Sequence, residues 1–182
     1  MFKETSKELL DFLSKSPTAF HAVENYRQIL NADGFKELLE SEHWDIVPGG
    51  KYYVTRNNTS ILAFKVGTKL DNYSFNIVTS HTDSPTFKVK ENAEIEVKNK
   101  YTQLNTEGYG GMLCATWLDR PLSIAGRVLV SEGNSIVTKL LNIDRDLLMI
   151  PNVAIHMNRA ANDGFKYNLQ VDMLPLLSAG DG

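Results

Sequence analysis

The chain has 182 residues, 42% of them hydrophobic, and its 19 basic and 22 acidic residues give a formal net charge of −3. This composition is typical of a globular chain and excludes a disordered one, and the lack of a basic excess argues against a nucleic-acid partner. No apolar run is long enough to span a bilayer, so we expect a cytoplasmic protein without a membrane partner. Cys114 has no second cysteine with which to form a disulfide or a cysteine-based zinc cluster.

Two predicted helices open the chain. Thr5 and Glu8 have the spacing of a capping box, and apolar residues follow on one helical face, which predicts a helix from near Thr5 toward Lys15. Pro17 suits the first turn of a second helix, and Gly34 is its expected C-terminal cap. The first strands are therefore expected only after these helices.

Strand signals begin near residue 51. The β-rich runs 51–56 and 60–64 are separated by two asparagines and predict a hairpin. Residues 75–81 are rich in β-branched side chains and are apolar on both faces, which predicts a buried strand in a sheet flanked by helices. A polar cluster at residues 81–85 follows this strand, at the position where ligands gather in α/β sheets.

The second half of the chain has a different pattern, in which polar and apolar residues alternate. Three runs predict strands, namely residues 94–98, 127–130 and 135–140. From about residue 92 onward we therefore expect a β-rich module that is distinct from the part before it.

His81 and Asp83 are the strongest candidates for chemistry. Residues i and i+2 of an extended segment point to the same side, so an imidazole and a carboxylate converge at the end of the predicted strand. Neutral imidazole is a good zinc ligand, and a nearby carboxylate can orient it or tune the metal. The spacing alone leaves a turn or capping role open for both residues.

The other histidines carry weaker signals. His21 lies among apolar residues of the second predicted helix, where we expect a hydrogen-bonded, partly buried structural residue, and we expect His43 to be exposed. His156 lies in the apolar run 150–157, which could be a strand that projects the imidazole toward a site, although a structural role stays open. No phosphate loop, dinucleotide fingerprint or serine elbow is present.

Longer motifs carry a family resemblance. Residues 80–90, Ser-His-Thr-Asp-Ser-Pro-Thr-Phe-Lys-Val-Lys, resemble the strand-end motif of the aspartyl aminopeptidase family of dinuclear zinc exopeptidases. Other segments resemble this family in order and spacing, namely residues 16–23, 48–57, 109–111, 116–128 and 150–159. Together these segments span nearly the whole chain.

This resemblance implies an α/β fold with a catalytic domain of the zinc-exopeptidase type. Residues 1–91 would be the N-terminal part of that domain, and residues 92–182 would belong to an inserted β-rich dimerisation domain that we expect to be incomplete. The family assembles through this domain into a large tetrahedral homo-oligomer, so the resemblance also implies self-association.

The implied activity is that of a metallo-aminopeptidase, which releases N-terminal residues from a peptide substrate by metal-activated water. By resemblance His81 would ligate one of two zinc ions, and Asp83 would serve catalysis by orienting that histidine and tuning the metal site. His156 matches a histidine that reaches the substrate pocket of a neighbouring subunit. Cobalt or manganese could replace zinc, and the preference for acidic or neutral N-terminal residues stays open.

The chain departs from the family by stopping early. Family members continue beyond the segment that matches residues 174–177, and the continuation carries the bridging aspartate, the general base and the remaining ligands. We therefore expect the N-terminal part of an enzyme, whether truncated, cleaved or naturally short, with the missing C-terminal portion as a further partner. The alternative is an inactive fragment or pseudoenzyme that acts only in assembly.

Overall fold

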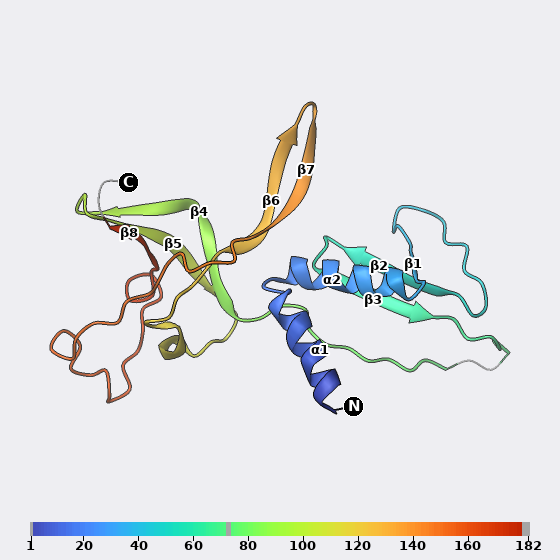
Figure 1. The fold of residues 1–182 in the computed structure, drawn as a ribbon, viewed down its shortest axis with the longest axis horizontal. Coiled ribbons are helices and arrows are strands. Elements are labelled where there is room, and N and C mark those ends of the chain that lie inside the picture. Colours follow the sequence, from blue (N-terminus) through green and yellow to red (C-terminus); the bar gives the residue numbers. More distant parts are fainter. Residues whose placement is uncertain (1, 72–73, 180–182) are drawn as a thin grey trace. The chain divides into compact units, whose positions relative to one another are not determined.

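The computed structural model describes residues 2–71 and 74–179, which are grouped in two compact units (Figure 1). The first unit holds the residues up to Asp83 together with Ala125–Asn142, and the second holds Ser84–Ile124 and the residues from Ile143 onward. The chain thus leaves the first unit after Asp83, returns to it for one segment and leaves it again. Among the described residues, no helix has both the length and the apolar character needed to cross a membrane.

The first helix, α1, spans Phe2–Ser14. The predicted cap at Thr5 is wrong, because the helix already includes the residues before it and the Ser6 hydroxyl donates to the Phe2 carbonyl oxygen at 2.8 Å. No residue of α1 is buried within the described part of the chain, and Leu9, Leu10 and Leu13 are more than half exposed. Helical periodicity therefore identified the element but not its first residue.

The second helix, α2, spans Ala19–Ala32 and begins two residues after Pro17. Thr18 is its N-cap, and the Thr18 hydroxyl oxygen accepts from the backbone N–H of His21 at 3.4 Å. The imidazole Nδ1 of His21 lies 2.8 Å from the same hydroxyl, and burial lowers the pKa of this histidine. The expected structural role of His21 is confirmed. Gly34 follows the C-cap in the left-handed region, with φ of +81°.

A small sheet follows the helices, in the order β1-β2-β3. Its strands are β1 (Lys36–Glu37), β2 (Lys51–Arg56) and β3 (Ser60–Lys65). The antiparallel pair of β2 and β3 confirms the predicted hairpin, and both asparagines of its turn are left-handed, with φ of 51° and 54°. Exposed His43, whose side chain is 91% accessible, lies in the loop before β2, as expected.

Tyr53 of β2 connects the sheet to helix α2. Its ring is only 1% exposed, and its hydroxyl donates to Asn31 Oδ1 at 3.0 Å and to Glu37 Oε2 at 3.4 Å. Arg27 also donates to this Glu37 oxygen at 2.8 Å, and the Glu37 side chain raises the pKa of Arg27. A polar cluster therefore joins the helix, β1 and β2 at the edge of the buried core.

The segment that returns to the first unit is a second hairpin, made of β6 (Ala125–Glu132) and β7 (Ser135–Asn142). Arg127 is one of its contacts with the rest of the first unit, and its guanidinium carbon lies 4.4 Å from the centroid of the Phe20 ring. Arg127 also donates to Asn57 Oδ1 at 3.1 Å. The strand signals at 127–130 and 135–140 are confirmed as parts of these two strands.

The second unit is built on the antiparallel sheet β4-β5-β8. The strands are β4 (Thr86–Val97), β5 (Tyr101–Tyr109) and β8 (Leu176–Ala179), and a short 3-10 helix, η1, spans Cys114–Trp117. The pairing of β4 with β5 shifts register between Val89 and Glu94, so the ladder is irregular there. Ile150 and Met173 are fully buried and form part of the core of this unit.

Two predicted strands are wrong. Residues 75–81 form no strand, because no strand among the described residues forms a β-ladder with this segment, and Phe75 and Val78 are 80% and 98% exposed. The run 150–157 also forms no strand apart from an isolated bridge at Ile150. Instead the chain turns, and the Met157 N–H donates to the Ala154 carbonyl oxygen at 2.8 Å.

Candidate metal and substrate site

His81 and Asp83 lie close together, as the i, i+2 spacing predicts, although their segment is not a strand. The imidazole Nδ1 of His81 is 2.8 Å from the backbone carbonyl oxygen of Asp83 and 3.3 Å from its Oδ1 atom. Both acceptors therefore face one ring nitrogen. The carbonyl oxygen can only accept, so Nδ1 carries the proton in the neutral ring and the lone pair is on Nε2.

Thr82 holds this segment in place, a role that the sequence reasoning did not assign. Its hydroxyl donates to the backbone carbonyl oxygen of Thr59, beside the first residue of β3, at 2.7 Å. In an extended segment side chains alternate between two sides, so Thr82 points away from the side shared by residues 81 and 83. This alternation could have predicted from the sequence that Thr82 contacts a different part of the chain. The confirmed hairpin thus anchors the candidate site.

These residues fit one position of a zinc site. A zinc-bound histidine typically donates its second ring N–H to a carbonyl or carboxylate oxygen, and Asp83 offers both to Nδ1. The His81 side chain is 80% exposed, so Nε2 is accessible to a metal ion. Over residues 2–71 and 74–179, however, no group of three or more His, Cys, Asp or Glu residues could hold a metal. A complete zinc site needs three or four protein ligands, so others must join His81.

His156 belongs to the second unit and is described by itself. It lies in the turn that the Met157 to Ala154 hydrogen bond closes, and it is exposed. Its imidazole makes no hydrogen bond or ion pair with another described residue. The structure thus brings His81 and Asp83 together, whereas His156 is an exposed residue of the other unit.

Residues 12–181 match the model of the family described as aminopeptidase I zinc metalloprotease (M18). A curated relative, a probable M18 family aminopeptidase 2 from Clostridium novyi, is 51% identical over 94% of this chain. The aspartyl aminopeptidase of Dictyostelium discoideum is 45% identical over 96% of this chain. The chain spans 40% and 36% of the length of these two relatives.

Solved structures agree with these matches. A chain in the cryo-EM structure of the Ape4 and Nbr1 complex is 40% identical and superimposes with a TM-score of 0.91, covering 97% of this chain and 34% of that one. The S. cerevisiae mApe1 dodecamer is 27% identical with a TM-score of 0.78, covering 97% of this chain and 38% of that one. The predicted fold class is confirmed, since the described residues have the α/β fold of the corresponding part of such aminopeptidases.

Proposed function

Since the chain belongs to the aminopeptidase I zinc metalloprotease (M18) family, we propose that it forms part of an enzyme that releases N-terminal residues from peptides. The observation that carries this proposal is the pairing of His81 Nδ1 with Asp83, which leaves Nε2 as a metal ligand inside a segment that the family model covers. The Dictyostelium relative is called an aspartyl aminopeptidase, which supports a preference for acidic N-terminal residues over neutral ones.

In the proposed mechanism His81 would hold one of two zinc ions through Nε2. Asp83 holds the ring by its backbone oxygen and, through Oδ1, increases the basicity of the imidazole. Zinc, or cobalt or manganese in its place, would supply Lewis-acid activation of water and of the scissile carbonyl group when bound. Ligands and a general base from the remaining portion of the enzyme complete the site.

The proposed domain arrangement follows the resemblance. Residues 1–91 would belong to the catalytic domain, and residues 92–182 would belong to the dimerisation domain. This boundary differs from that of the two compact units, because residues 84–91 belong to the second unit and Ala125–Asn142 belongs to the first. Self-association through the latter is supported by a structural neighbour that is described as a dodecamer. The exposed His156 then contacts the peptide in the pocket of a neighbouring subunit. We place the enzyme in the cytoplasm, in keeping with the single cysteine of the chain.

A second candidate function has its own supporting observation. The part of the chain that the structure describes has no group of three or more potential metal-binding residues. A lone imidazole binds zinc weakly, so this polypeptide by itself would act only in assembly, as an inactive fragment or pseudoenzyme.

The two candidates differ in metal content, mass and activity. Intact mass, zinc per polypeptide and hydrolysis of aspartyl and leucyl p-nitroanilides would be measured on the purified protein and on two variants. If the chain forms part of an active enzyme, we expect two zinc ions per complete site and hydrolysis that His81→Ala abolishes. The control His43→Ala should leave the activity intact, because that side chain is 91% exposed and lies outside the candidate site. A single species without zinc or hydrolysis would exclude an active enzyme and support the assembly role.

A further inference from the structure

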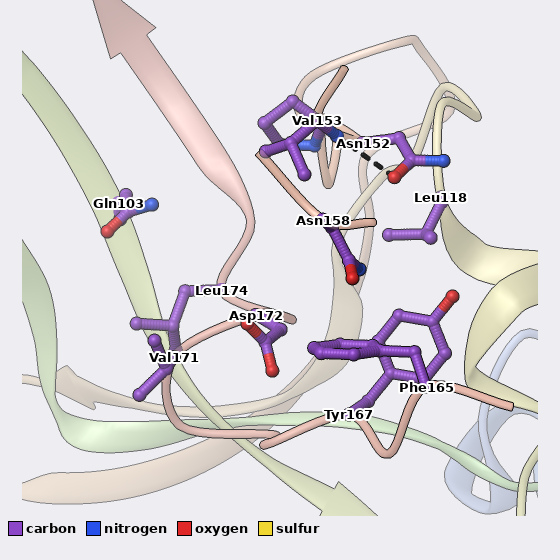
Figure 2. Close-up of a pocket in the computed structure, with 11 residues that line it drawn as sticks. Gln103, Leu118, Asn152, Val153, Asn158, Phe165, Tyr167, Val171, Asp172 and Leu174 are labelled. Carbon is purple, nitrogen blue, oxygen red and sulfur yellow. Dashed lines mark hydrogen bonds between the residues drawn. The ribbon is translucent and has the colours of Figure 1, made fainter. Parts of the chain in front are cut away.

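The second unit contains a cavity of about 210 Å³ between strand β5 and the loop that runs from Pro151 to Leu174. Leu118, Val153, Val171 and Leu174 contribute apolar walls, and Gln103, Asn152 and Asn158 contribute amide groups (Figure 2). The cavity is large enough for a small organic group and too small for a folded segment of chain.

Two aromatic rings form one wall of this cavity. Phe165 and Tyr167 pack edge to face, with centroids 5.2 Å apart and an angle of 89° between the ring planes. Both residues are half-buried, so their rings are held in the wall instead of lying free in solvent. An edge-to-face pair leaves electron-rich ring surface available, and such surface attracts cations.

Asp172 supplies the only charge among the lining residues. Its Oδ2 atom accepts from the backbone N–H of Asn168 at 2.7 Å, which fixes the carboxylate within the loop. No Lys, Arg or His side chain lines the cavity, and Asp172 makes no ion pair with a described residue. Among the described residues, therefore, no cation neutralises this negative charge.

We propose that this cavity is a binding site for a primary ammonium group. The carboxylate of Asp172 balances the positive charge, the ring surfaces of Phe165 and Tyr167 attract it, and the amide oxygen of Asn158 can accept from a remaining N–H group. An anion would face the carboxylate without any compensating cation. This proposal does not depend on the proposed peptidase activity, because it uses only residues of the second unit and neither His81 nor Asp83.

The first test uses n-butylammonium chloride, with 1-butanol as the neutral probe of equal length. Binding to the intact protein would be followed by isothermal titration and by NMR line broadening of the probe. The cation should bind saturably and the alcohol should not. Equal binding of both probes, or no saturable binding of the cation, would overturn the proposal.

The variant Asp172→Asn keeps an oxygen that can accept from the Asn168 N–H while it removes the charge. It should weaken n-butylammonium binding about tenfold or more, as expected for loss of a charged hydrogen-bond partner. The control is Asp163→Asn, an exposed position in the same loop that does not line the cavity. A similar change in both variants would refute a local role for Asp172.

The aromatic wall is tested separately. Tyr167→Phe retains a ring and should retain binding, whereas Tyr167→Leu should weaken it about two- to fivefold. Tighter binding of an Nα-acetyl-lysine amide than of n-butylammonium would identify a lysine side chain as the source of the ammonium group. Tighter binding of the free amine would identify a small-molecule ligand. Equal binding to Tyr167→Phe and Tyr167→Leu would contradict the role of the rings.

Discussion

Replacing Tyr53 by phenylalanine removes a single hydroxyl at the edge of the core of the first unit and keeps the buried ring. The hydroxyl makes one good hydrogen bond, to Asn31 at 3.0 Å, and one weak one, to Glu37 at 3.4 Å. Asn31 is exposed, so water can replace the lost donor, and Glu37 keeps Arg27 at 2.8 Å. We therefore expect a loss of about 1 kcal/mol in the free energy of unfolding, near the middle of the range for a single hydrogen bond.

Urea unfolding followed by circular dichroism at helical wavelengths suits this prediction, because both α-helices of the described chain, α1 and α2, belong to the first unit. The matched control is Tyr26→Phe, whose side chain is 38% exposed and whose hydroxyl has no hydrogen bond with a described residue. That variant should change the free energy by less than about 0.5 kcal/mol. Equal effects of the two substitutions would refute the reasoning about the Tyr53 hydroxyl.

Three further predictions concern pH, metal binding and a turn. Burial lowers the pKa of His21, so its contribution to stability is complete above the unfolded pKa of 6.5 and is lost as the pH falls through the folded pKa. His21→Gln should therefore flatten the fall in melting temperature between about pH 7.5 and 5.5. An unchanged slope would contradict this prediction. In the complete enzyme, Asp83→Asn should weaken zinc binding about 10- to 100-fold in a chelator competition, because only the backbone oxygen would still hold His81. Unchanged affinity would exclude the positioning role. Gly110 has φ of +76°, so Gly110→Ala should cost about 1–2 kcal/mol in thermal unfolding, whereas Gly111→Ala, with open space at its Cβ, should be nearly neutral.

Local signals in the sequence predicted the elements that local interactions stabilise. The hairpin of β2 and β3 depends on two asparagines that tolerate left-handed backbone, and helix α2 depends on its own periodicity and on Gly34. A strand also needs a neighbour, and no composition rule could reveal that residues 75–81 have none among the described segments. For the same reason the packing of the second hairpin on the first unit was not predicted, because it includes contacts between residues far apart in the sequence, such as those of Arg127 with Phe20 and Asn57.

The candidate site was predicted to a similar extent. The i, i+2 spacing correctly predicted that the side chains of His81 and Asp83 lie close together. It could not show that the backbone oxygen of Asp83, as well as its carboxylate, faces the ring, because this depends on the local turn of the chain. The cavity around Asp172 could not be predicted from a sequence motif, because its lining residues come from several separate parts of the sequence.

Because Ala125–Asn142 belongs to the first unit, the parts of that unit are synthesised in two separate stages. The helices and the first hairpin are complete once Asp83 has been made, but the second hairpin follows only after Ser84–Ile124, a delay of several seconds at about 5–20 residues per second. During that interval the face of α2 around Phe20 stays open to solvent on the nascent chain. Closure of the first unit is thus a late, long-range step, and any pause in translation between the two segments prolongs the exposure of this face to chaperones and proteases.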